Sequence, residues 1–336
     1  MRILVLTNMY PPHAYGGYEY LCRDAAERWQ AQGHDVVVLT STVRVAGAEE
    51  VSPGVVPVWR SLQLYWDDHV ILRPPPWRRL RWELGNKRVL DRVIDEFRPD
   101  VVSAWAMGAT SLGLLSRAHR RGLPVVLVLA DEWPVYGPAL DGWLRMFARR
   151  RLAGRVAQAL TGLPTLPPRL DTIGPACFAS DALRTAVRAR SPWSFPNSTV
   201  VHLGIETREF AAAGQRGLDA GSETASASGG SPPVERPWQW KLLYVGRIDR
   251  RKGIDVAVRA LALCPPAATL SIVGRGDDEV REELAQLATE LGLADRVTFD
   301  HVPRDELAAV YRAADAFIFP PTWEEPFGLV PLEAMA

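Results

Sequence analysis

Short apolar runs alternate with helical patterns along most of the chain. The runs over residues 3–7, 101–104 and 125–129 are only a few residues long, and each fits a strand buried on both faces of a parallel sheet. Between such runs the apolar residues recur at helical spacing, as over residues 18–32, where the pattern ends at Gly33. This alternation predicts an α/β fold in which helices cover parallel sheets.

The chain is long enough for two such domains, because 336 residues exceed the usual length of one. Residues 211–237 are rich in Ala, Gly, Ser and Pro and carry no apolar period, so they cannot bury enough surface to offset the entropy of ordering. We predict a domain over residues 1–205, a flexible linker or insertion over 206–237 and a second domain over 238–336. Residues 171–178 are read as a late strand of the first domain.

The composition of the chain indicates which partners and which cellular compartment to expect. Lys and Arg together number 39, as do Asp and Glu, so no bulk attraction to nucleic acid is implied. The cysteines Cys22, Cys177 and Cys264 are scattered and lack the spacing of a metal site, which favours a reduced, cytoplasmic protein. The N-terminal apolar stretch is too short for a signal peptide, and no apolar run approaches the roughly 20 residues of a membrane span.

The last residues, PPTWEEPFGLVPLEAMA, place charged and polar groups around a predicted helix start. Gly328 falls where the helix begins, so its amide and that of Leu329 have no partner within the helix and attract acceptors. Glu325 precedes this point in a loop, and Glu333 lies about two turns further along. Amides suit phosphate and carboxylates suit sugar hydroxyls, so the segment fits a phosphorylated, polyhydroxylated ligand. The alternative is that both glutamates are solvated surface charges.

A second polar cluster follows the predicted strand over residues 242–245. Gly246 permits close approach of the backbone, and Arg247 and Lys252 precede a helical pattern. A guanidinium fork and an ammonium point charge beside a helix start form a clamp for a diphosphate. Cations near a turn can instead serve only solubility. A later strand ends in a G-x-G turn, at Gly274 and Gly276, which is weak evidence alone.

The string EPFGLVPLEAMA resembles the donor-site signature of family 4 retaining glycosyltransferases, which have the GT-B fold. The resemblance implies two Rossmann-like domains that face each other across a cleft. It assigns Glu325 to the transferred sugar and Glu333 to the ribose of the donor, with Phe327, Gly328 and Leu329 beside the donor. Because family members continue further, the resemblance also implies a C-terminally truncated chain whose second domain is incomplete.

Two other stretches carry the same resemblance. The string GRIDRRKG is similar to the family motif whose Arg and Lys bind the donor diphosphate, which assigns that role to Arg247 and Lys252. The G-x-G turn and Gly246 would then lie beside the nucleotide. Near the N-terminus, a strand, Pro-Pro, Gly16-Gly17 and a helix repeat the family's opening layout, where the paired glycines lie beside the donor phosphates and the acceptor.

The chain also departs from the family pattern. Many members carry a His-Asp pair after the strand at 125–129, where this chain has Ala130 and Asp131. Asp131 is a candidate catalytic residue, or it caps the following turn. At the domain hinge Leu203 replaces the family's Asn. These departures leave a non-catalytic or truncated descendant that only binds nucleotide sugar or acceptor as the alternative. Another GT-B activity, such as that of an epimerase or a phosphorylase, is disfavoured in its phosphorylase form because no lysine suits pyridoxal phosphate.

The expected reaction moves a hexosyl group from a UDP- or GDP-sugar to a glycan, lipid or small-molecule acceptor with retention of configuration. The sequence contains no Asp-x-Asp, so protein cations are expected to replace the metal ion of GT-A enzymes, and no metal or cofactor is expected. The leaving phosphate itself would accept the proton of the acceptor hydroxyl, so no separate base is required.

Two stretches of the sequence combine several arginines with large apolar residues. Residues 73–92 mix Arg with Trp, and residues 145–155 read RMFARRRLAGR. Arg and Trp on one helix face suit the interface of an anionic membrane, which predicts a peripheral contact at the inner face of the membrane. The alternatives are a solvated helix face with both indoles packed inward, or a site for an anionic acceptor.

Overall fold

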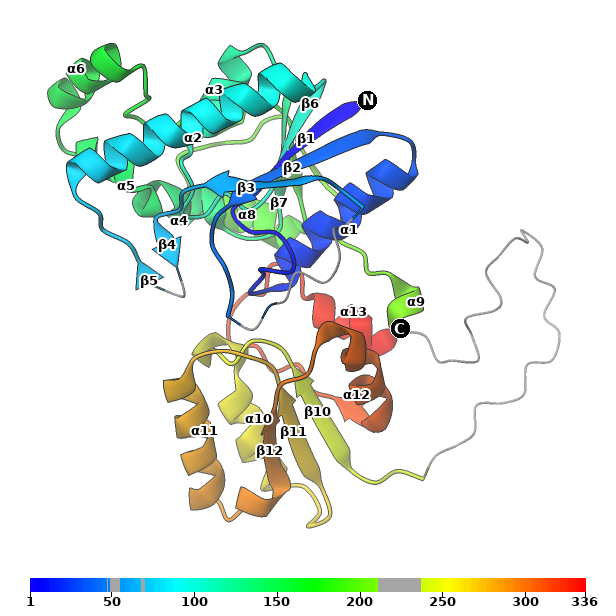
Figure 1. Cartoon of the computed structure of the whole chain (residues 1–336). Helices are drawn as coiled ribbons and strands as arrows, with labels where there is room; N and C mark the ends of the chain where they lie inside the picture. Colours follow the sequence, from blue (N-terminus) through cyan, green and yellow to red (C-terminus); the bar gives the residue numbers. More distant parts are fainter. Residues whose placement is uncertain (47, 49–54, 68–69, 211–236) are drawn as a thin grey trace. The chain divides into compact units, whose positions relative to one another are not determined.

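The computed structural model describes residues 1–46, 48, 55–67, 70–210 and 237–336. These residues divide into two compact units, Met1–Leu203 and Gly204–Ala336 (Figure 1). Most of the predicted linker, residues 211–236, lies outside the described residues. The predicted domain boundaries at 205 and 237 stay a prediction.

The first unit is built on a seven-stranded sheet of parallel strands in the order β3-β2-β1-β6-β7-β8-β9. The order reverses at β1, as in doubly wound nucleotide-binding folds, so the first βα turn lies at the switch point. The strands of the unit, including the separate antiparallel pair β4 and β5, are β1 (Arg2–Leu6), β2 (Asp35–Ser41), β3 (Val58–Leu62), β4 (Trp66–Asp67), β5 (Val70–Ile71), β6 (Val101–Ala104), β7 (Val125–Leu129), β8 (Ala176–Phe178) and β9 (Ser198–Val200).

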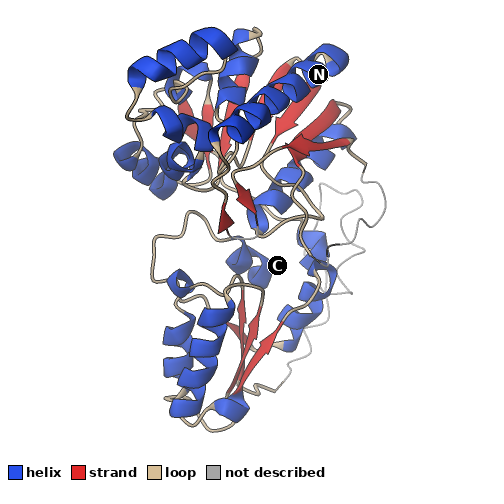
Figure 2. Cartoon of the chain, turned by 60° about the vertical axis from the view of Figure 1, so that its left-hand side comes forward, coloured by secondary structure: helices blue, strands red, loops and turns tan. Residues whose placement is uncertain are grey.

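Helices cover both faces of this sheet (Figure 2). Ile3 and Val5 of β1 pack with Cys22 and Ala26 of α1 on one face. Because side chains alternate along a strand, the buried Leu4 belongs to the opposite face. The helices are α1 (Gly17–Ala31), α2 (Pro76–Phe97), α3 (Gly113–Arg120), α4 (Trp133–Leu140), α5 (Gly142–Phe147), α6 (Arg151–Thr161), α7 (Leu170–Ile173) and α8 (Asp181–Arg190).

The strand predicted over residues 171–178 is wrong in its first half. Residues Leu170–Ile173 form the short helix α7, and only Ala176–Phe178 form strand β8. The change occurs at Gly174, where an added β-carbon would lie 1.8 Å from the carbonyl oxygen of Val125. Only glycine lets the chain cross β7 so closely before it enters the sheet, and apolar content alone does not show this crossing.

The second unit is a four-stranded parallel sheet in the order β12-β11-β10-β13. Its elements are α9 (Thr207–Phe210), β10 (Lys241–Val245), the 3-10 helix η1 (Arg250–Lys252), α10 (Ile254–Leu261), β11 (Thr269–Val273), α11 (Asp278–Glu290), η2 (Ala294–Arg296), β12 (Val297–Asp300), η3 (Arg304–Glu306), α12 (Leu307–Ala313), β13 (Ala316–Phe317) and α13 (Leu329–Met335).

Both faces of this smaller sheet are also covered. Leu270 and Ile272 of β11 point toward α10 and α11 and form one core with Val258 and Leu284. Val273 is an odd number of residues away along β11, so its side chain is on the other face, in a second cluster that includes residues of α12 and α13. The sheet therefore lies between two helical layers, as expected for a parallel sheet. This arrangement leaves the ends of the strands, rather than the faces, open for function.

Candidate functional site

Glycines at the ends of β10 and β11 let two loops meet backbone to backbone. At Gly274, which has φ +157°, an added β-carbon would lie 1.9 Å from the carbonyl oxygen of Gly246. At Gly276 it would lie 2.1 Å from the carbonyl oxygen of Ile248. Any larger residue would force the loops apart. The glycines thus hold both loops at the carboxyl edge of the sheet, and Arg247 emerges there directly after Gly246.

A third glycine brings the start of α10 against the segment that follows β13. Gly253 has φ +64°, and an added β-carbon would lie 1.9 Å from the carbonyl oxygen of Pro320. The amide of Thr322 donates to the carbonyl oxygen of Arg251 at 2.9 Å. These contacts join two segments that are far apart in sequence. They place Lys252, the last residue of η1, beside the EEPFG segment.

Lys252 and Glu325 form an ion pair at this junction. The distance from Lys252 Nζ to Glu325 Oε2 is 2.6 Å, and both side chains are 19% exposed. Trp323 donates from its indole nitrogen to the same carboxylate oxygen at 2.9 Å, and its ring centroid lies 5.4 Å from Lys252 Nζ. The carboxylate is therefore held in place by two donors while remaining accessible to solvent.

Arg247 lies near the Lys252–Glu325 pair, and its side chain is available to bind a ligand. The side chain is exposed and forms no hydrogen bond or ion pair within the described residues. Its carbonyl oxygen accepts from the Tyr244 hydroxyl at 2.9 Å. Burial raises the pKa of Tyr244, the charges of Glu325 and Asp249 raise it further, and Arg247 lowers it. Because all three charges act on one phenol, Arg247 and Glu325 belong to one charged corner of the unit.

The two arginines between Arg247 and Lys252 in the sequence each pair with an acid of the same unit. Arg251 donates to Asp249, and this hydrogen bond lowers the pKa of Asp249 to about 2. Arg250 pairs with Glu283 of α11. Both guanidinium groups are more than half exposed. The cations of this corner that pair with neither Asp249 nor Glu283 are thus Arg247 and Lys252.

Glu333 is buried on α13, which begins directly after Gly328 as predicted. The side chain is 4% exposed. Its two oxygens accept from Arg304 Nη1 at 3.1 Å and from the Tyr311 hydroxyl at 3.0 Å. Sequence reasoning missed both donors, and no local pattern links them to Glu333. The predicted role of Glu333 toward a ribose, like those of the half-buried neighbours Phe327 and Leu329, stays a prediction.

The remaining predicted site residues belong to the first unit. Gly16 is the N-cap of α1, where its amide donates to Glu19 Oε2 at 3.0 Å, and Gly17 is the first residue of the helix. Asp131 accepts from the amide of Trp133 at 3.0 Å and from the Tyr136 hydroxyl. These bonds match the capping alternative for Asp131. Its assignment as a catalytic residue stays a prediction.

Comparison with known families agrees with the two-unit fold. The family model described as Glycosyltransferase Family 4 matches residues 15–161, and the one described as Glycosyl transferases group 1 matches residues 233–336. The chain belongs to glycosyltransferase family 4. One curated relative of this family 4 chain is the D-inositol 3-phosphate glycosyltransferase of Mycolicibacterium vanbaalenii, which is 37% identical over 155 residues. That match covers 41% of this chain and 30% of the relative.

Solved structures resemble the whole family 4 chain. The sucrose-phosphate synthase of Thermosynechococcus elongatus matches with a TM-score of 0.64 and 20% identity, over 100% of this chain and 79% of that one. Anabaena HepE in complex with UDP-glucose matches with a TM-score of 0.59 and 20% identity, over 100% and 78%. At this identity the likeness concerns the fold alone. The predicted GT-B fold, with two Rossmann-like domains, is confirmed.

Proposed function

We propose that this chain is a retaining glycosyltransferase that moves a hexosyl group from a UDP- or GDP-sugar to a glycan, lipid or small-molecule acceptor. The observation that carries the proposal is the Lys252–Glu325 pair, held at 2.6 Å beside the uncommitted guanidinium of Arg247. The corner offers two cations and one carboxylate at a glycine-lined edge of a parallel sheet. Ligands of such sheets bind outside the carboxyl ends of the strands.

The chemistry follows from the charges. Departure of a nucleoside diphosphate builds negative charge on its phosphate oxygens, and preorganised cations lower the barrier where that charge develops. A guanidinium fork and an ammonium group suit two adjacent phosphates. An incoming diphosphate would compete with Glu325 for Lys252. The carboxylate that is released would then accept hydrogen bonds from the hydroxyls of the transferred sugar.

Metal independence is part of the proposal. Arg247 and Lys252 supply the positive charge that a divalent ion provides in other transferases, and they do so without a carboxylate cage. Retention follows if the acceptor hydroxyl attacks on the face from which the diphosphate departs, with the leaving phosphate taking its proton. Anabaena HepE is described with UDP and UDP-glucose, which supports UDP-glucose as the first donor to test.

A second candidate is a protein that binds nucleotide sugar without transferring it. Asp131 favours this candidate, because both of its oxygens are occupied by the turn that it caps. Ala130 precedes it and brings no imidazole to the end of β7. Under the transfer mechanism above, neither position needs to supply a base, so catalysis remains the better proposal.

The deciding experiment uses a panel of UDP- and GDP-sugars with glycan, lipid and small-molecule acceptors, each with and without EDTA. We expect one donor to release its nucleoside diphosphate, to form a product of retained configuration, and to do so equally in EDTA. Saturable donor binding without release, measured by calorimetry, would favour the binding protein. Loss of activity in EDTA that is restored by Mg²⁺ would overturn metal independence alone.

We also propose that α6 carries the peripheral membrane contact expected for residues 145–155. Within the described part of the chain, no helix combines the length and apolar character that a membrane span requires. Helix α6 instead exposes Leu152, Val156 and Leu160 by 76%, 60% and 81%. Spaced four residues apart, they form one stripe on one face. No acidic residue occurs over residues 142–170, so the surroundings of the stripe are basic. An apolar stripe with basic flanks suits an anionic membrane surface, and the contact would place the protein on the cytoplasmic face.

Co-sedimentation with vesicles tests this contact. The protein should bind phosphatidylglycerol vesicles and not phosphatidylcholine vesicles, and Val156→Ser with Leu160→Ser should lower the bound fraction about tenfold or more, since each buried side chain contributes roughly 1.5–3 kcal/mol. Leu263→Ser is the matched control, because Leu263 is 90% exposed in the second unit. Equal binding by the double variant would remove α6 from the contact.

A further inference from the structure

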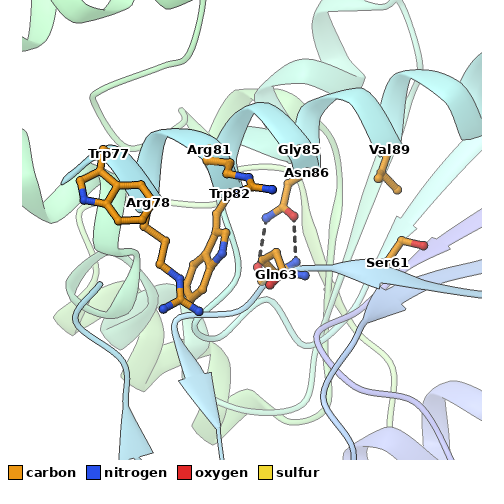
Figure 3. A pocket seen from close by; sticks show the side chains of 9 residues that line it. All are labelled: Ser61, Gln63, Trp77, Arg78, Arg81, Trp82, Gly85, Asn86 and Val89. Carbon is orange, nitrogen blue, oxygen red and sulfur yellow. Dashed lines mark hydrogen bonds between the residues drawn. The ribbon is translucent and has the colours of Figure 1, made fainter. Parts of the chain in front are cut away.

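A hollow of about 560 Å³ lies in the first unit between α2 and the end of β3 (Figure 3). Its walls include Trp77, Arg78, Arg81 and Trp82 from α2, and Ser61 from β3. The hollow is named the α2 groove below. Its volume is within the range of sites for small ligands, about 300–1,000 Å³. It belongs to a different unit from the Lys252–Glu325 corner.

The floor of the α2 groove is fixed by a paired hydrogen bond. The side-chain amide of Asn86 accepts from the backbone amide of Gln63 at 2.8 Å and donates to its carbonyl oxygen at 3.0 Å (Figure 3). This pairing joins α2 to the end of β3. Trp82 packs against Tyr65, with ring centroids 5.7 Å apart. The site is therefore largely preformed.

Among the described residues that line it, the α2 groove carries positive charge and no acid. None of the nine residues that line it is acidic, and two are arginines. Arg78 lies over the Trp82 ring, 5.0 Å from its centroid. Arg81 is exposed and forms no ion pair or side-chain hydrogen bond within the described residues. Two guanidinium groups without carboxylates form a receptor for a carboxylate or a phosphate.

The aromatic walls indicate what the anion is attached to. Trp77 is 66% exposed, so the alternative in which both indoles of this stretch pack inward is wrong. Trp82 is half-buried, and its indole N–H makes no hydrogen bond within the described residues. The hydroxyl of Ser61 is likewise available. An amphipathic ligand with a C–H face for an indole and hydroxyls for these polar groups would satisfy the walls, and a sugar ring has both.

We propose that the α2 groove binds an anionic carbohydrate, with its sugar ring against Trp77 and Trp82 and its charged group on Arg78 and Arg81. The charged group is a phosphate ester or a uronic acid carboxylate, since both have the planar-fork complementarity that guanidinium favours. Binding at this site does not require the proposed transfer reaction. The reading of the bound sugar as an acidic acceptor does rest on the proposed function.

Calorimetric titration of the whole chain, without any donor, tests the site. The ligands are glucose 6-phosphate, glucuronate, glucose and inorganic phosphate. We expect at least one acidic sugar to bind about tenfold or more tightly than glucose or phosphate alone, which identifies the anionic group as ester or carboxylate. Arg81→Ala should weaken that binding by about tenfold, the size of one lost charge-assisted contact. Trp77→Ala should weaken it by a similar factor, because it removes an aromatic face from the sugar ring. Both side chains are exposed, so these truncations leave no buried cavity.

Two controls separate the groove from other effects. Arg88→Ala removes an exposed arginine further along α2 that does not line the groove, and affinity should not change. Lys252→Ala should also bind acidic sugar like the parent chain, even if it abolishes transfer. Equal affinity for glucose and the acidic sugars, or unchanged affinity in Arg81→Ala, would overturn the proposal. If the protein binds no sugar but binds phosphatidylglycerol vesicles through Trp77 and Arg81, the groove is a membrane contact instead.

Discussion

Two acids of each unit that are withdrawn from solvent are held in opposite ways. In the second unit Glu325 and Glu333 each have a cationic partner, Lys252 and Arg304 respectively. In the first unit Glu83 and Asp141 are both buried, and neither forms an ion pair within the described residues. The second unit therefore pairs Glu325 and Glu333 with cations, whereas the first unit buries Glu83 and Asp141 without one.

The buried acids of the first unit have neutral donors. Glu83 on α2 accepts from the hydroxyls of Tyr65, at 2.8 Å, and Ser111. Asp141 accepts from the amides of Leu112, Trp143 and Leu144, each at 3.0 Å. Burial raises the pKa of both carboxyl groups, and the proximity of Asp141 raises that of Glu83 further. These bonds tie α2, α3 and α5 together, so this pair is structural, whereas the proposed mechanism requires the Lys252–Glu325 pair to open for a ligand.

The largest expected effect comes from a substitution that breaks the Lys252–Glu325 pair. Lys252→Ala should lower kcat for transfer by about 100- to 1,000-fold, the usual consequence of losing one group that stabilises charge in the transition state. The fold should persist, because the Glu325 carboxylate can reach solvent and keeps its bond to Trp323. Steady-state kinetics with a UDP- or GDP-sugar, together with a thermal unfolding curve, measure both quantities.

Lys241→Ala is the matched control for that variant. Lys241 is the exposed first residue of β10, at the end of the strand opposite the Lys252 corner. Its removal should leave kcat within a factor of two or so, as expected for a surface change away from the chemistry. Comparable losses in the two lysine variants would mean that overall charge, and not the Lys252–Glu325 pair, governs activity.

The buried carboxyl group of Glu83 should make the stability of the protein depend on pH. The pKa of Glu83 is raised to about 8, mainly by burial, from an ordinary value of 4.5. The folded state therefore holds a proton that the unfolded chain releases, and stability falls as pH rises from about 4.5 to 8, by at most about 1.4 kcal/mol per pH unit. Glu83→Gln should remove the part of this slope above about pH 6, where the raised pKa of Asp141 no longer contributes, and should make the protein more stable than the parent at pH 9.

Urea unfolding at pH 5, 7 and 9 measures that slope. Glu96→Gln is the control, because Glu96 is exposed near the end of the same helix. It should leave the pH dependence as it is in the parent chain. A Glu83→Gln protein whose stability falls as steeply as the parent's between pH 7 and 9 would show that Glu83 is ionised in the fold and that the contrast between the units is wrong.

The same contrast explains what the sequence could predict. Gly246, Gly274 and the Arg-Lys spacing are local features that report backbone approach and charge within one loop, and the structure puts them at the predicted strand ends. The placement of Lys252 against Glu325 is a tertiary contact, yet it followed because both belong to motifs of one family site. Local pattern was sufficient wherever a side chain acts near its own strand end.

Partners from distant segments were not predictable in this way. Arg304 and Tyr311 reach Glu333 from η3 and α12, and nothing in their own surroundings marks them as its donors. Glu83 and Asp141 look like ordinary charged residues of a helix and a turn. Only packing, which removes water from around both, turns them into buried acids. Burial of a charge is a property of the assembled unit, so a periodicity read from sequence cannot show it.

The smallest expected effect concerns Asp249, a half-buried acid of the second unit. Arg251 holds the pKa of Asp249 at about 2, below its ordinary value of 3.8, so the stabilisation is present above pH 3.8 and is lost as pH falls toward 2. The pair is partly exposed, by 55% for Arg251 and 24% for Asp249, so Asp249→Asn should cost less than about 1 kcal/mol at pH 7. The amide can still accept from the Arg251 backbone, which preserves the turn.

Urea unfolding at pH 7 and pH 3 should show a gap between parent and variant that narrows in acid. Asp300→Asn, at an exposed position at the end of β12, should show no such gap. A gap that widens in acid would mean that Asp249 is protonated more readily when folded, as Glu83 is, and the two units would then no longer differ in how they hold their acids.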